Sequence, residues 1–461
     1  MSIVDDVQKS AMTRFQIVTI ATCLAVMVVD GFDVIAMSFS AYYVADDWGI
    51  SSSTLGYVLS ASTAGMALGS LALSPLADRF GRRTVAVGGL AVAALGMLYS
   101  GVSPNIEHLV ASRLITGVGV GGIMAATGII IAEYSSRRRL GLTMALYAAA
   151  NGVGGILGGL LAKEIIPAFG WHSVFLFGAA ATTLFLVVAY FALPESLDYL
   201  ATRNDPRSVK RLNHIAAKMG RSVEPEVNNA GASAESSVVA KSRYSQLFSG
   251  GTGFHTVFLT LGFGTLMAAF YFMLGWTAQL VSRATGSGEV GIQVATLLPL
   301  GGLVGSIAFG LLTGIIRSRP LAVAALSLAS ISTFMMAYTI ATGSAPVVTA
   351  LVLGILLQAG ITSYYGIIPQ AFPAQLRTTG FGFVLGMGRV IGIVAPIGAG
   401  YLLGVWSSAT VFALSGVLVG VSAIVMAAYF LFTYRTSPVG EPPTAPTSGV
   451  ATAEDDRVVG A

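Results

Sequence analysis

Long apolar segments follow one another along almost the whole chain, separated by short polar segments. About 20 consecutive apolar residues are needed for a helix to cross the hydrocarbon layer of a membrane. Twelve segments meet this requirement, and we predict that each forms a membrane-spanning helix. The first is too long for the core of a signal peptide and carries two acidic residues, so we expect it to be retained. The predicted spans are 16–44, 53–75, 84–103, 107–132, 141–163, 172–193, 254–281, 289–316, 320–342, 345–368, 378–404 and 407–433.

Six spans lie on each side of a long polar stretch, which predicts an all-α membrane protein built from two six-helix bundles. The expected units are a first bundle at 1–193, a central loop at 194–253, a second bundle at 254–433 and a disordered tail at 434–461. Within the loop, RSVKRLNHIAAKM (207–219) alternates apolar and basic positions at helical spacing, which predicts a helix on the membrane surface. The apolar positions of this helix are Val209, Leu212, Ile215, Ala216 and Met219.

The placement of lysine and arginine predicts the orientation, because cytoplasmic loops carry the excess of these residues. The loops on one side hold only Lys163 and Arg283. We therefore expect both termini and the central loop to be cytoplasmic. The other side holds Lys9, Arg14, Arg79, Arg82, Arg83, Arg137, Arg138, Arg139, the eight basic residues between 203 and 243, Arg317, Arg319, Arg377, Arg435 and Arg457.

Composition agrees with a membrane protein and argues against several other classes. Only 10% of the residues are charged, against about 25% in soluble domains, and the mean hydropathy is +0.78. The net charge of +4 reflects the loop asymmetry rather than a nucleic-acid partner. Cys23 is the single cysteine and the four histidines are scattered, so we expect neither a metal site nor another cofactor. No nucleotide-binding Gly-Lys motif points to a pump, and little supports a membrane enzyme.

The two halves of the chain resemble each other. GSLALSPLADRFGRR (69–83) aligns with GSIAFGLLTGIIRSR (305–319) at an offset of 236 residues (305 minus 69), and both end the second span of their half. EYSSRRRLG (133–141) pairs with QAFPAQLRTTG (370–380) between the fourth and fifth spans. Duplicated six-helix halves are typical of secondary transporters, whose substrate site lies between the halves. Chance similarity between apolar helices is the alternative.

The intramembrane charges are concentrated in the first half. Asp30 and Asp33 lie three residues apart, and therefore on one face of the first span. Each costs roughly 2.5–3.5 kcal/mol in the membrane. Two carboxylates this close in a low dielectric are not easily ionised together, so we expect one of them to carry a proton reversibly. The alternative is a permanently ionised pair that Arg113 holds in place.

Arg113, in the fourth span, is expected at a similar depth to the acidic pair. A guanidinium keeps its charge, so Arg113 must be paired or face water. It either exchanges partners during a transport cycle or forms a fixed buried ion pair. Glu133, at the cytoplasmic end of the same span, completes the proton-coupling candidates Asp30, Asp33, Arg113 and Glu133.

Arg389 is the conspicuous charge of the second half. It lies eleven residues into its span, about 16 Å along the helix axis and close to the midplane. No acidic residue of the second half lies at this depth, so Arg389 is a candidate clamp for a carboxylate. We expect Gly386, Gly388 and Gly392 to leave room for the ligand. The alternative is an ion pair with Asp30 or Asp33 across the two halves.

Polar and aromatic side chains at membrane depth are candidates to complete a substrate site for an aromatic ligand. Packing or anchoring at the membrane interface is the alternative for each of them. Gln279 and Gln358 are additional polar residues at this depth. The candidates are Tyr147, Asn151, Tyr271, Phe272, Trp276, Tyr364 and Tyr365.

Three motifs resemble signatures of the major facilitator superfamily. They are SPLADRFGRR (74–83), LVASRLITGVGVGG (109–122) and PESLDYL (194–200), with Ser74 where the first signature usually begins with glycine. The resemblance implies the twelve-helix fold and transport by alternating access, with no enzymatic activity. It also implies a gating role for the loop after the second span. The gating candidates are Asp78, Arg79, Gly81, Arg82 and Arg83.

Two further motifs narrow this resemblance. DGFD (30–33) and GMGRVIG (386–392) are similar to regions of the bacterial aromatic acid:proton symporters. This implies a monomeric, proton-coupled importer of the bacterial inner membrane, in which Asp30, Asp33 and Arg389 are required. The substrates of that family are benzoate, hydroxybenzoates, protocatechuate, vanillate and gentisate.

Other substrate classes remain open at this point. Sugar porters share the PES motif, but a neutral sugar has no anionic group for Arg389 to bind. Drug:proton antiporters carry Gly-Pro in the fifth helix, whereas GVGGILGG (152–159) has no proline. Another organic anion, or a nutrient sensor built on a transporter scaffold, is a further alternative.

Overall fold

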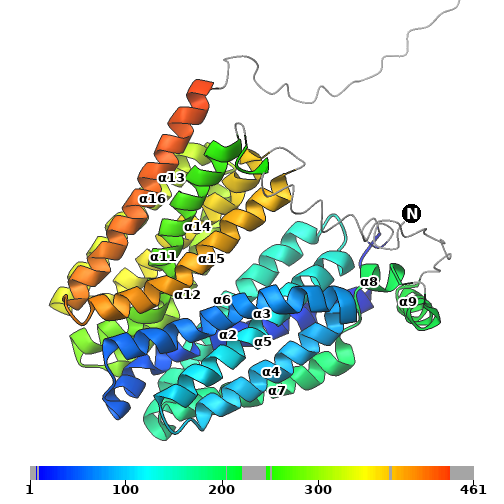
Figure 1. Ribbon diagram of the computed structural model, residues 1–461, viewed down its shortest axis with the longest axis horizontal. Helices are drawn as coiled ribbons and strands as arrows, with labels where there is room; N and C mark the ends of the chain where they lie inside the picture. Colours follow the sequence, from blue (N-terminus) through cyan, green and yellow to red (C-terminus); the bar gives the residue numbers. More distant parts are fainter. Residues whose placement is uncertain are drawn as a thin grey trace, which may run out of the picture.

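The computed structural model describes residues 7, 10–203, 205–220, 246–249, 252–372 and 376–436 of the 461-residue chain. Within these ranges the regular structure is helical (Figure 1). The helices are α2 (Arg14–Trp48), α3 (Ser52–Phe80), α4 (Arg82–Gly101), α5 (Ile106–Tyr134), α6 (Leu140–Phe169), α7 (His172–Ala192), α8 (Leu197–Ala201), α9 (Pro206–Lys218), α11 (Thr252–Thr285), α12 (Gly288–Leu312), α13 (Ser318–Thr342), α14 (Pro346–Ala371), α15 (Arg377–Leu402) and α16 (Ser408–Thr436).

Each of the twelve predicted spans corresponds to one helix that is long and apolar enough to cross a membrane, so the predicted all-α membrane fold is confirmed. The predicted ends differ most at α3 and α6, which continue through polar residues beyond the apolar segment. These helices end where Gly81 (φ 103°) and Gly170 (φ 76°) take backbone conformations that other residues rarely adopt. Conformation at a glycine, rather than loss of apolar character, therefore sets these two ends.

The spans form two bundles, α2–α7 and α11–α16, that diverge toward the end of the molecule where α8 and α9 lie (Figure 1). At the opposite end, which we call the closed end, side chains join the bundles directly. The hydroxyls of Tyr57 in α3 and Tyr401 in α15 are 2.7 Å apart. An ion pair of 3.1 Å links Lys163 in α6 to Glu289 in α12. These contacts hold the two bundles together at the closed end.

The predicted duplication is visible in how glycines pack. A Cβ atom on Gly69 of α3 would meet the backbone of Val118 in α5, and one on Gly305 of α12 would meet the backbone of Ile355 in α14. In each half, the second and fourth spans therefore approach each other at equivalent glycines, with their backbones in contact. Such a match is not expected from chance similarity between apolar segments. The matched residues are Gly65 with Gly301, Gly69 with Gly305, and Gly117 with Gly354.

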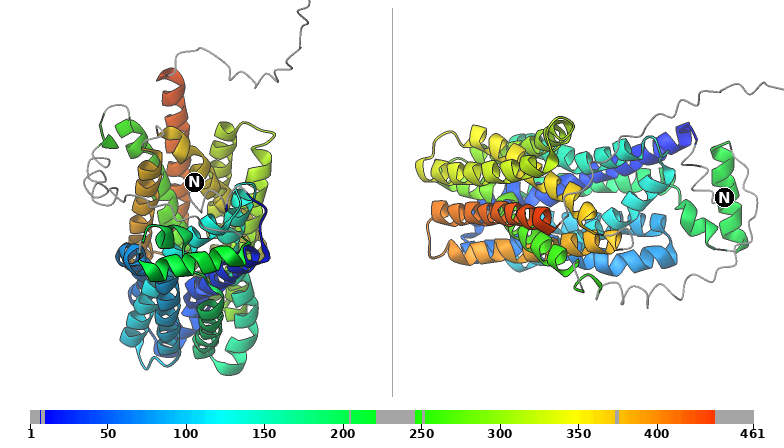
Figure 2. Two further views of the ribbon diagram at one scale, coloured as in Figure 1. Left: turned by 90° about the vertical axis from the view of Figure 1, so that its right-hand side faces the viewer. Right: turned by 90° about the horizontal axis from the view of Figure 1, so that it is seen from above.

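Helix α9 lies across the end of the first bundle (Figure 2). The Ser208 hydroxyl and backbone N–H donate hydrogen bonds to Asp205, which caps the helix, and these bonds lower the pKa of Asp205. The structure confirms the predicted helix. Leu212, Ile215 and Met219 are buried in a core that they share with the ends of the first bundle, so most of this face packs on protein, whereas Val209 is 39% exposed.

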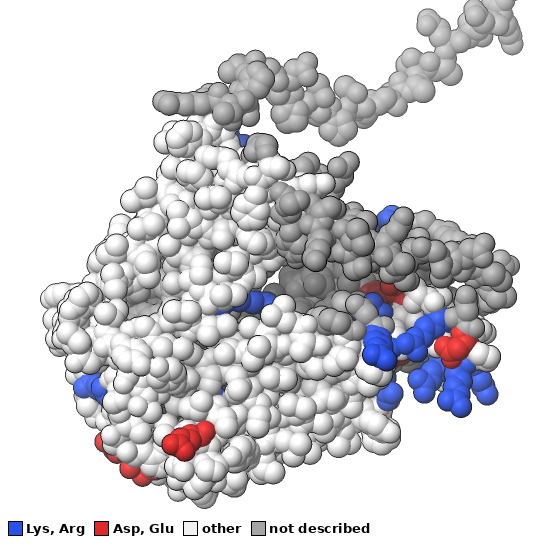
Figure 3. Space-filling model, viewed as in Figure 1, with Lys and Arg blue, Asp and Glu red and all other residues white. Residues whose placement is uncertain are grey.

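Lysine and arginine side chains gather at the α8–α9 end, whereas most of the bundle surface in the same view carries no charge (Figure 3). This is the distribution on which the predicted orientation depends. The predicted tail at 434–461 begins inside α16, which continues to Thr436. Residues 437–461 of that tail, and residues 221–245 of the central loop, lie outside the described residues.

Candidate functional site

The two acidic residues of α2 are buried inside the first bundle, with Asp30 4% and Asp33 2% exposed. Close contact between α2 and α6 creates the surroundings of Asp30. A Cβ atom on Gly31 would meet the backbone of Asn151, and one on Gly154 would meet the backbone of Val28. Because neither glycine has a side chain, the helices touch through their backbones and Asn151 lies directly beside Asp30.

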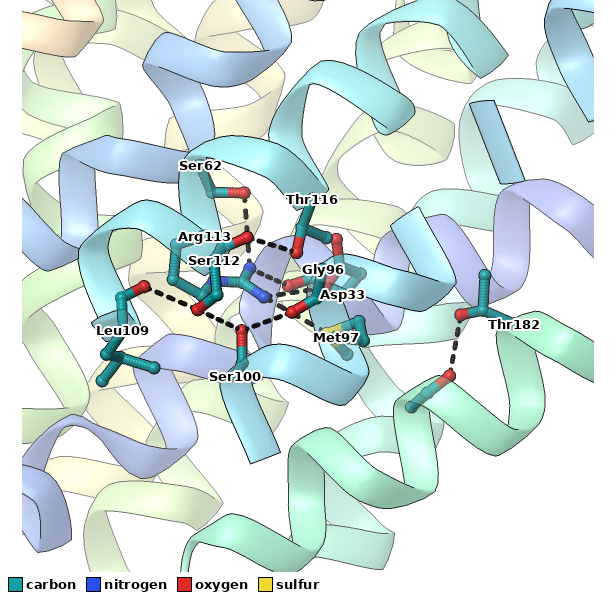
Figure 4. A network of polar contacts seen from close by, with 11 residues as sticks. Asp33, Ser62, Gly96, Met97, Ser100, Leu109, Ser112, Arg113, Thr116 and Thr182 are labelled. Carbon is teal, nitrogen blue, oxygen red and sulfur yellow. Dashed lines mark hydrogen bonds and ion pairs between the residues drawn. The ribbon is translucent and has the colours of Figure 1, made fainter. Parts of the chain in front are cut away.

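Arg113 of α5 is completely buried and points into a group of polar atoms (Figure 4). Its Nη1 donates to Asp33 Oδ1 over 2.9 Å, and its Nη2 donates to the backbone oxygen of Asp33 over 2.9 Å. Ser62 Oγ and Met97 Sδ lie 3.3 and 3.2 Å from the guanidinium, and the Phe175 ring lies 5.5 Å away. The predicted contact between Arg113 and the acidic pair therefore exists, and it involves Asp33.

The surroundings of Asp30 contain no cation that forms an ion pair with it among the described residues. Its Oδ2 accepts a long hydrogen bond of 3.4 Å from Asn151 Nδ2, and its Oδ1 has no hydrogen-bond partner in the described structure. The Arg113 guanidinium is already committed to Asp33. The two carboxylates, although three residues apart, thus differ in kind: Asp33 is ion-paired and Asp30 is not.

A cavity of about 660 Å³ lies between the two bundles, with walls from α2, α6, α11, α12 and α14. This size is within the range of about 300–1,000 Å³ that is usual for small-molecule sites. Asn151 is part of the wall and also contacts Asp30, so it connects the cavity to the buried acid. The apolar lining includes Ile35, Phe270, Leu274, Leu298 and Pro299, and the polar lining includes Asn151, Ser306, Gln358, Thr362 and Tyr365.

Arg389 of α15 is exposed, and no described residue forms an ion pair or hydrogen bond with its guanidinium. It lies close enough to the hydroxyls of Tyr147, Tyr271 and Tyr365 for its charge to act on them. These tyrosines come from α6, α11 and α14, and Tyr365 lines the cavity. The predicted alternative, an ion pair with Asp30 or Asp33, is absent from this conformation.

The glycines around Arg389 do not all leave room for a ligand, which corrects the sequence-based expectation. A Cβ atom on Gly388 would meet the Phe263 ring, and one on Gly392 would meet the Tyr271 ring. Only Gly386, of the three, has open space at this position. Gly388 and Gly392 therefore allow α15 to pack against aromatic side chains of α11, which brings Arg389 near Tyr271.

The aromatic candidates separate into two groups. Tyr365 is 43% exposed and lines the cavity, and the Tyr147 and Tyr271 hydroxyls lie near Arg389. The other three, Phe272, Trp276 and Tyr364, are buried within the second bundle. For these residues the alternative, a role in packing, is the one that fits. Trp276 Nε1 donates to the Pro396 carbonyl (3.1 Å), the Tyr364 hydroxyl lies 2.9 Å from Ser422 Oγ, and the Phe272 and Phe412 ring centroids are 5.5 Å apart.

Several cavity residues were not among the sequence candidates. Phe270, Leu274 and Pro299 look like any other apolar residue of a membrane helix, so no local signal distinguishes them. Ser306 and Thr362 form a contact of 3.2 Å between α12 and α14, and such small hydroxyls are common in packed spans. Gln358, noted in the sequence as an additional polar residue at membrane depth, lines the cavity as well.

Glu133 lies at the α8–α9 end, about 30 Å along α5 from Arg113. Its carboxylate accepts hydrogen bonds of 2.8 Å from the Ser196 hydroxyl and from the Leu197 backbone N–H, at the start of α8. An acidic group in this position stabilises a helix N-terminus. The structure therefore separates Glu133 from the other proton-coupling candidates and shows it capping α8.

The gating candidates contact the PESLDYL segment (194–200) of the same bundle. Glu195 accepts a hydrogen bond of 2.9 Å from the Arg83 backbone N–H, and a Cβ atom on Gly81 would collide with the same carboxylate. The backbone oxygen of Arg79 accepts a hydrogen bond from the Tyr199 hydroxyl (3.3 Å). Two motifs far apart in sequence thus form one structure at the α8–α9 end.

The remaining gating candidates complete this arrangement in part. The Arg82 guanidinium lies 5.8 Å from the centre of the Tyr199 ring, and that of Arg83 lies 5.5 Å from the Tyr190 ring. Cations and aromatic faces attract each other at such distances. The side chain of Asp78 lies outside those that the structure describes.

Comparisons with known proteins agree with this architecture. The profile of the Major Facilitator Superfamily matches residues 20–357. The 4-hydroxybenzoate transporter PcaK of Pseudomonas aeruginosa is 30% identical over 394 residues, which cover 85% of each chain. A gallate transporter of Pseudomonas putida is 29% identical over 402 residues, covering 87% of this chain and 88% of its own. The xylose transporter XylE from E. coli, in a partially occluded inward-open conformation, is 15% identical with a TM-score of 0.66, covering 92% of this chain and 100% of its own, which shows a shared fold.

Proposed function

Because the chain belongs to the major facilitator superfamily, and within it to the aromatic acid transporters, we propose that it imports aromatic carboxylates of the benzoate or hydroxybenzoate type together with protons. The observation that carries this proposal is the exposed guanidinium of Arg389, which has no ion-pair partner among the described residues. A cation close to Tyr365, which lines the cavity between the bundles, is suited to capture an anion.

The chemistry of the cavity fits the two parts of such a substrate. The planar fork of Arg389 can bind both oxygens of a carboxylate, and the Tyr365 hydroxyl beside the cavity can donate a further hydrogen bond. Phe270 and Leu274 offer apolar surface to the ring. A neutral sugar would leave the Arg389 charge without a counterion, so this arrangement favours the aromatic acid over the sugar alternative.

Asp30 is the proposed proton carrier. An ionised carboxylate that is buried without a cation costs several kcal/mol, whereas a protonated one is neutral and tolerates such surroundings. Asp33 already has a counterion in Arg113, which suits a permanently charged, structural member of the pair. Asn151 touches both Asp30 and the cavity, and is the proposed link between proton uptake and substrate binding.

Transport then follows from alternating access to this cavity. We assign the α8–α9 end, with its excess of basic residues, to the cytoplasm of a bacterial cell and the closed end to the outside of the inner membrane. In this orientation the described conformation faces inward. A single chain supplies all the residues of the proposed site, which is consistent with a monomer.

The test is uptake of labelled 4-hydroxybenzoate into proteoliposomes under an imposed pH gradient. Loss of the bidentate contact should make Arg389→Ala bind the substrate about 30-fold more weakly, and Arg389→Lys should recover only part of this loss because it lacks the fork. Arg317→Ala, which removes a distant cation just before the start of α13, is the control. An unchanged KM in Arg389→Ala would refute the proposed clamp.

A further inference from the structure

A second cavity, of about 590 Å³, lies at the α8–α9 end, between α9, the start of α2 and the end of α7. It belongs neither to the interface between the bundles nor to the substrate site proposed above. Its wall is strongly basic, and Glu195 is the acidic residue that lines it. The basic lining residues are Arg83, Arg207, Lys210, Arg211, His214 and Lys218.

The positive charge of this cavity is not neutralised by the protein. Glu195 directs one carboxylate oxygen to the backbone N–H groups of Arg83 and Ser196, where it caps local structure. No acidic residue in the described part of the chain forms an ion pair with the basic side chains of α9, which are exposed. The cavity is therefore ready to take an anion with several oxygen acceptors.

The rim of the cavity is apolar where it meets the outer surface of α7. Phe15 and Phe191 line it, and Phe191 is 81% exposed. Beyond Phe191, the outer face of α7 continues with exposed Leu184, Val187 and Val188, as expected for a surface in contact with lipid tails. A basic hollow thus opens directly onto an apolar stripe that runs into the membrane.

We propose that this cavity binds the headgroup of an anionic phospholipid, whose acyl chains run along α7. Phosphate oxygens would contact the arginines and lysines of α9, because charge-assisted hydrogen bonds from such groups are strong. Basic pockets at the cytoplasmic ends of spans are suited to this task. The inference relies on the cytoplasmic assignment of the α8–α9 end given above, but not on the substrate.

The headgroup would also hold α9 against the first bundle. Arg83 stands near the start of α4, whereas Arg207 and Arg211 belong to α9, so one bound phosphate group can bridge α9 to the first bundle. Helix α9 is otherwise held by its small buried face, which includes Leu212 and Ile215. We therefore expect anionic lipid to stabilise the protein against thermal unfolding.

The experiment compares the full-length protein in nanodiscs of phosphatidylcholine alone and of phosphatidylcholine with added phosphatidylglycerol. Native mass spectrometry measures retained lipid, and a thermal-shift assay measures stability. Each basic residue should contribute roughly fivefold to binding, so the variant Arg207→Gln/Lys210→Gln/Arg211→Gln should bind phosphatidylglycerol about a hundredfold more weakly and lose the thermal shift. The matched control removes Arg137, Arg138 and Arg139 from another loop of the same side.

Four outcomes overturn the proposal. Equal loss in the Arg137–Arg139 control would mean general attraction to an anionic surface, and an unchanged thermal shift in the α9 variant would mean that the cavity is not involved. The same stabilisation by inorganic phosphate in phosphatidylcholine nanodiscs would indicate a site for a soluble anion. Failure of Arg207→Lys/Arg211→Lys to retain lipid binding that the glutamine variant loses would show that positive charge on α9 does not bind the lipid. None of these measurements involves transport, so they leave the proposed function untouched.

Discussion

At the scale of single residues, the structure distinguishes two carboxylates that look equivalent in the sequence. Asp33 meets the Arg113 guanidinium through both its side chain and its backbone oxygen, whereas Asp30 receives one long hydrogen bond from Asn151. Removing the charge of each should therefore have different consequences for stability, even though both substitutions are expected to abolish uptake driven by a pH gradient.

We predict that Asp33→Asn strongly destabilises the protein and that Asp30→Asn does not. The first leaves Arg113 buried without a counterion, which costs about 3–5 kcal/mol, whereas the second removes no ion pair. Thermal unfolding of the purified protein in detergent measures the difference. The double variant Asp33→Asn/Arg113→Met should recover most of the lost stability. Equal destabilisation by Asp30→Asn would contradict the assignment of roles.

Asn151 allows a separate prediction about coupling. Asn151→Leu leaves Asp30 without its hydrogen-bond partner, so the maximal rate of pH-driven uptake should fall about tenfold. The KM should change little, because Arg389 remains. Gln358→Leu, which removes another amide from the cavity wall, is the matched control for changes in the cavity itself. A Vmax that is equal in both variants would remove Asn151 from the coupling mechanism.

At the scale of helices, close backbone contact at glycines positions the site. The α2–α6 pair is joined through Gly31 and Gly154, and this contact places Asn151 against Asp30. The same device joins α3 to α5 and α12 to α14 in the two halves. Packing of small residues is the main source of helix association in a membrane, where no hydrophobic effect separates lipid from leucine.

We predict that Gly154→Ala destabilises the protein by about 1–3 kcal/mol, because its methyl group would be forced into the backbone of Val28. Gly152→Ala, two residues away in the same helix, has open space at this position and should be neutral or slightly stabilising. Thermal unfolding of both variants decides the matter. A Gly154→Ala protein as stable as Gly152→Ala would show that α2 and α6 are not in backbone contact.

Hydropathy and loop charge were sufficient to predict the twelve spans and the two bundles, because these depend on properties summed over many residues. Because the hydrocarbon layer of a bilayer has a nearly constant thickness, the number of sufficiently long apolar segments gives the number of spanning helices. Side-chain direction could not be predicted in the same way. Trp276 and Tyr365 are both aromatic residues at membrane depth, but one packs inside the second bundle and the other faces the cavity. The difference depends on helix rotation, which tertiary packing sets.

Two features of the packing that the sequence did not predict have the same origin. Gly388 and Gly392 were expected to leave space for a ligand, but they accommodate aromatic rings of α11. The apolar face of α9, predicted to lie on the membrane surface, has Leu212, Ile215 and Met219 buried against the first bundle and Val209 exposed. In both places the sequence reports that a surface is small or apolar, and the partner that covers this surface comes from a distant part of the chain.

At the scale of the whole molecule, the closed end and the cavity characterise the inward-facing state, one of the two states of the proposed transport cycle. Contacts such as those of Tyr57 with Tyr401 and of Lys163 with Glu289 must break for the closed end to open. Close backbone approach adds to these contacts, because a Cβ atom on Gly400 of α15 would lie 2.6 Å from the Ser52 backbone oxygen of α3. A larger side chain at position 400 should therefore separate the bundles at the closed end and favour the outward-facing state.

We predict that Gly400→Leu shifts the protein toward the outward-facing state. In a Cys23→Ser background, Leu146→Cys on the cavity wall reports access from the α8–α9 side through its labelling rate by a membrane-impermeant maleimide. Labelling from that side should slow severalfold in Gly400→Leu. Gly398→Leu, on the same helix with open space around it, should leave the rate unchanged. Equal rates in both variants would contradict the proposed closure.

The central claim, that a proton and an aromatic carboxylate cross the membrane together, is tested most directly by recording both in one sample. Proteoliposomes receive labelled 4-hydroxybenzoate while a dye reports the external pH, and protein-free liposomes correct for passage of the neutral acid. We predict that the external medium becomes alkaline as substrate enters, and that Asp30→Asn abolishes this change. Substrate entry through the wild-type protein with no alkalinisation beyond that of protein-free liposomes would contradict the account.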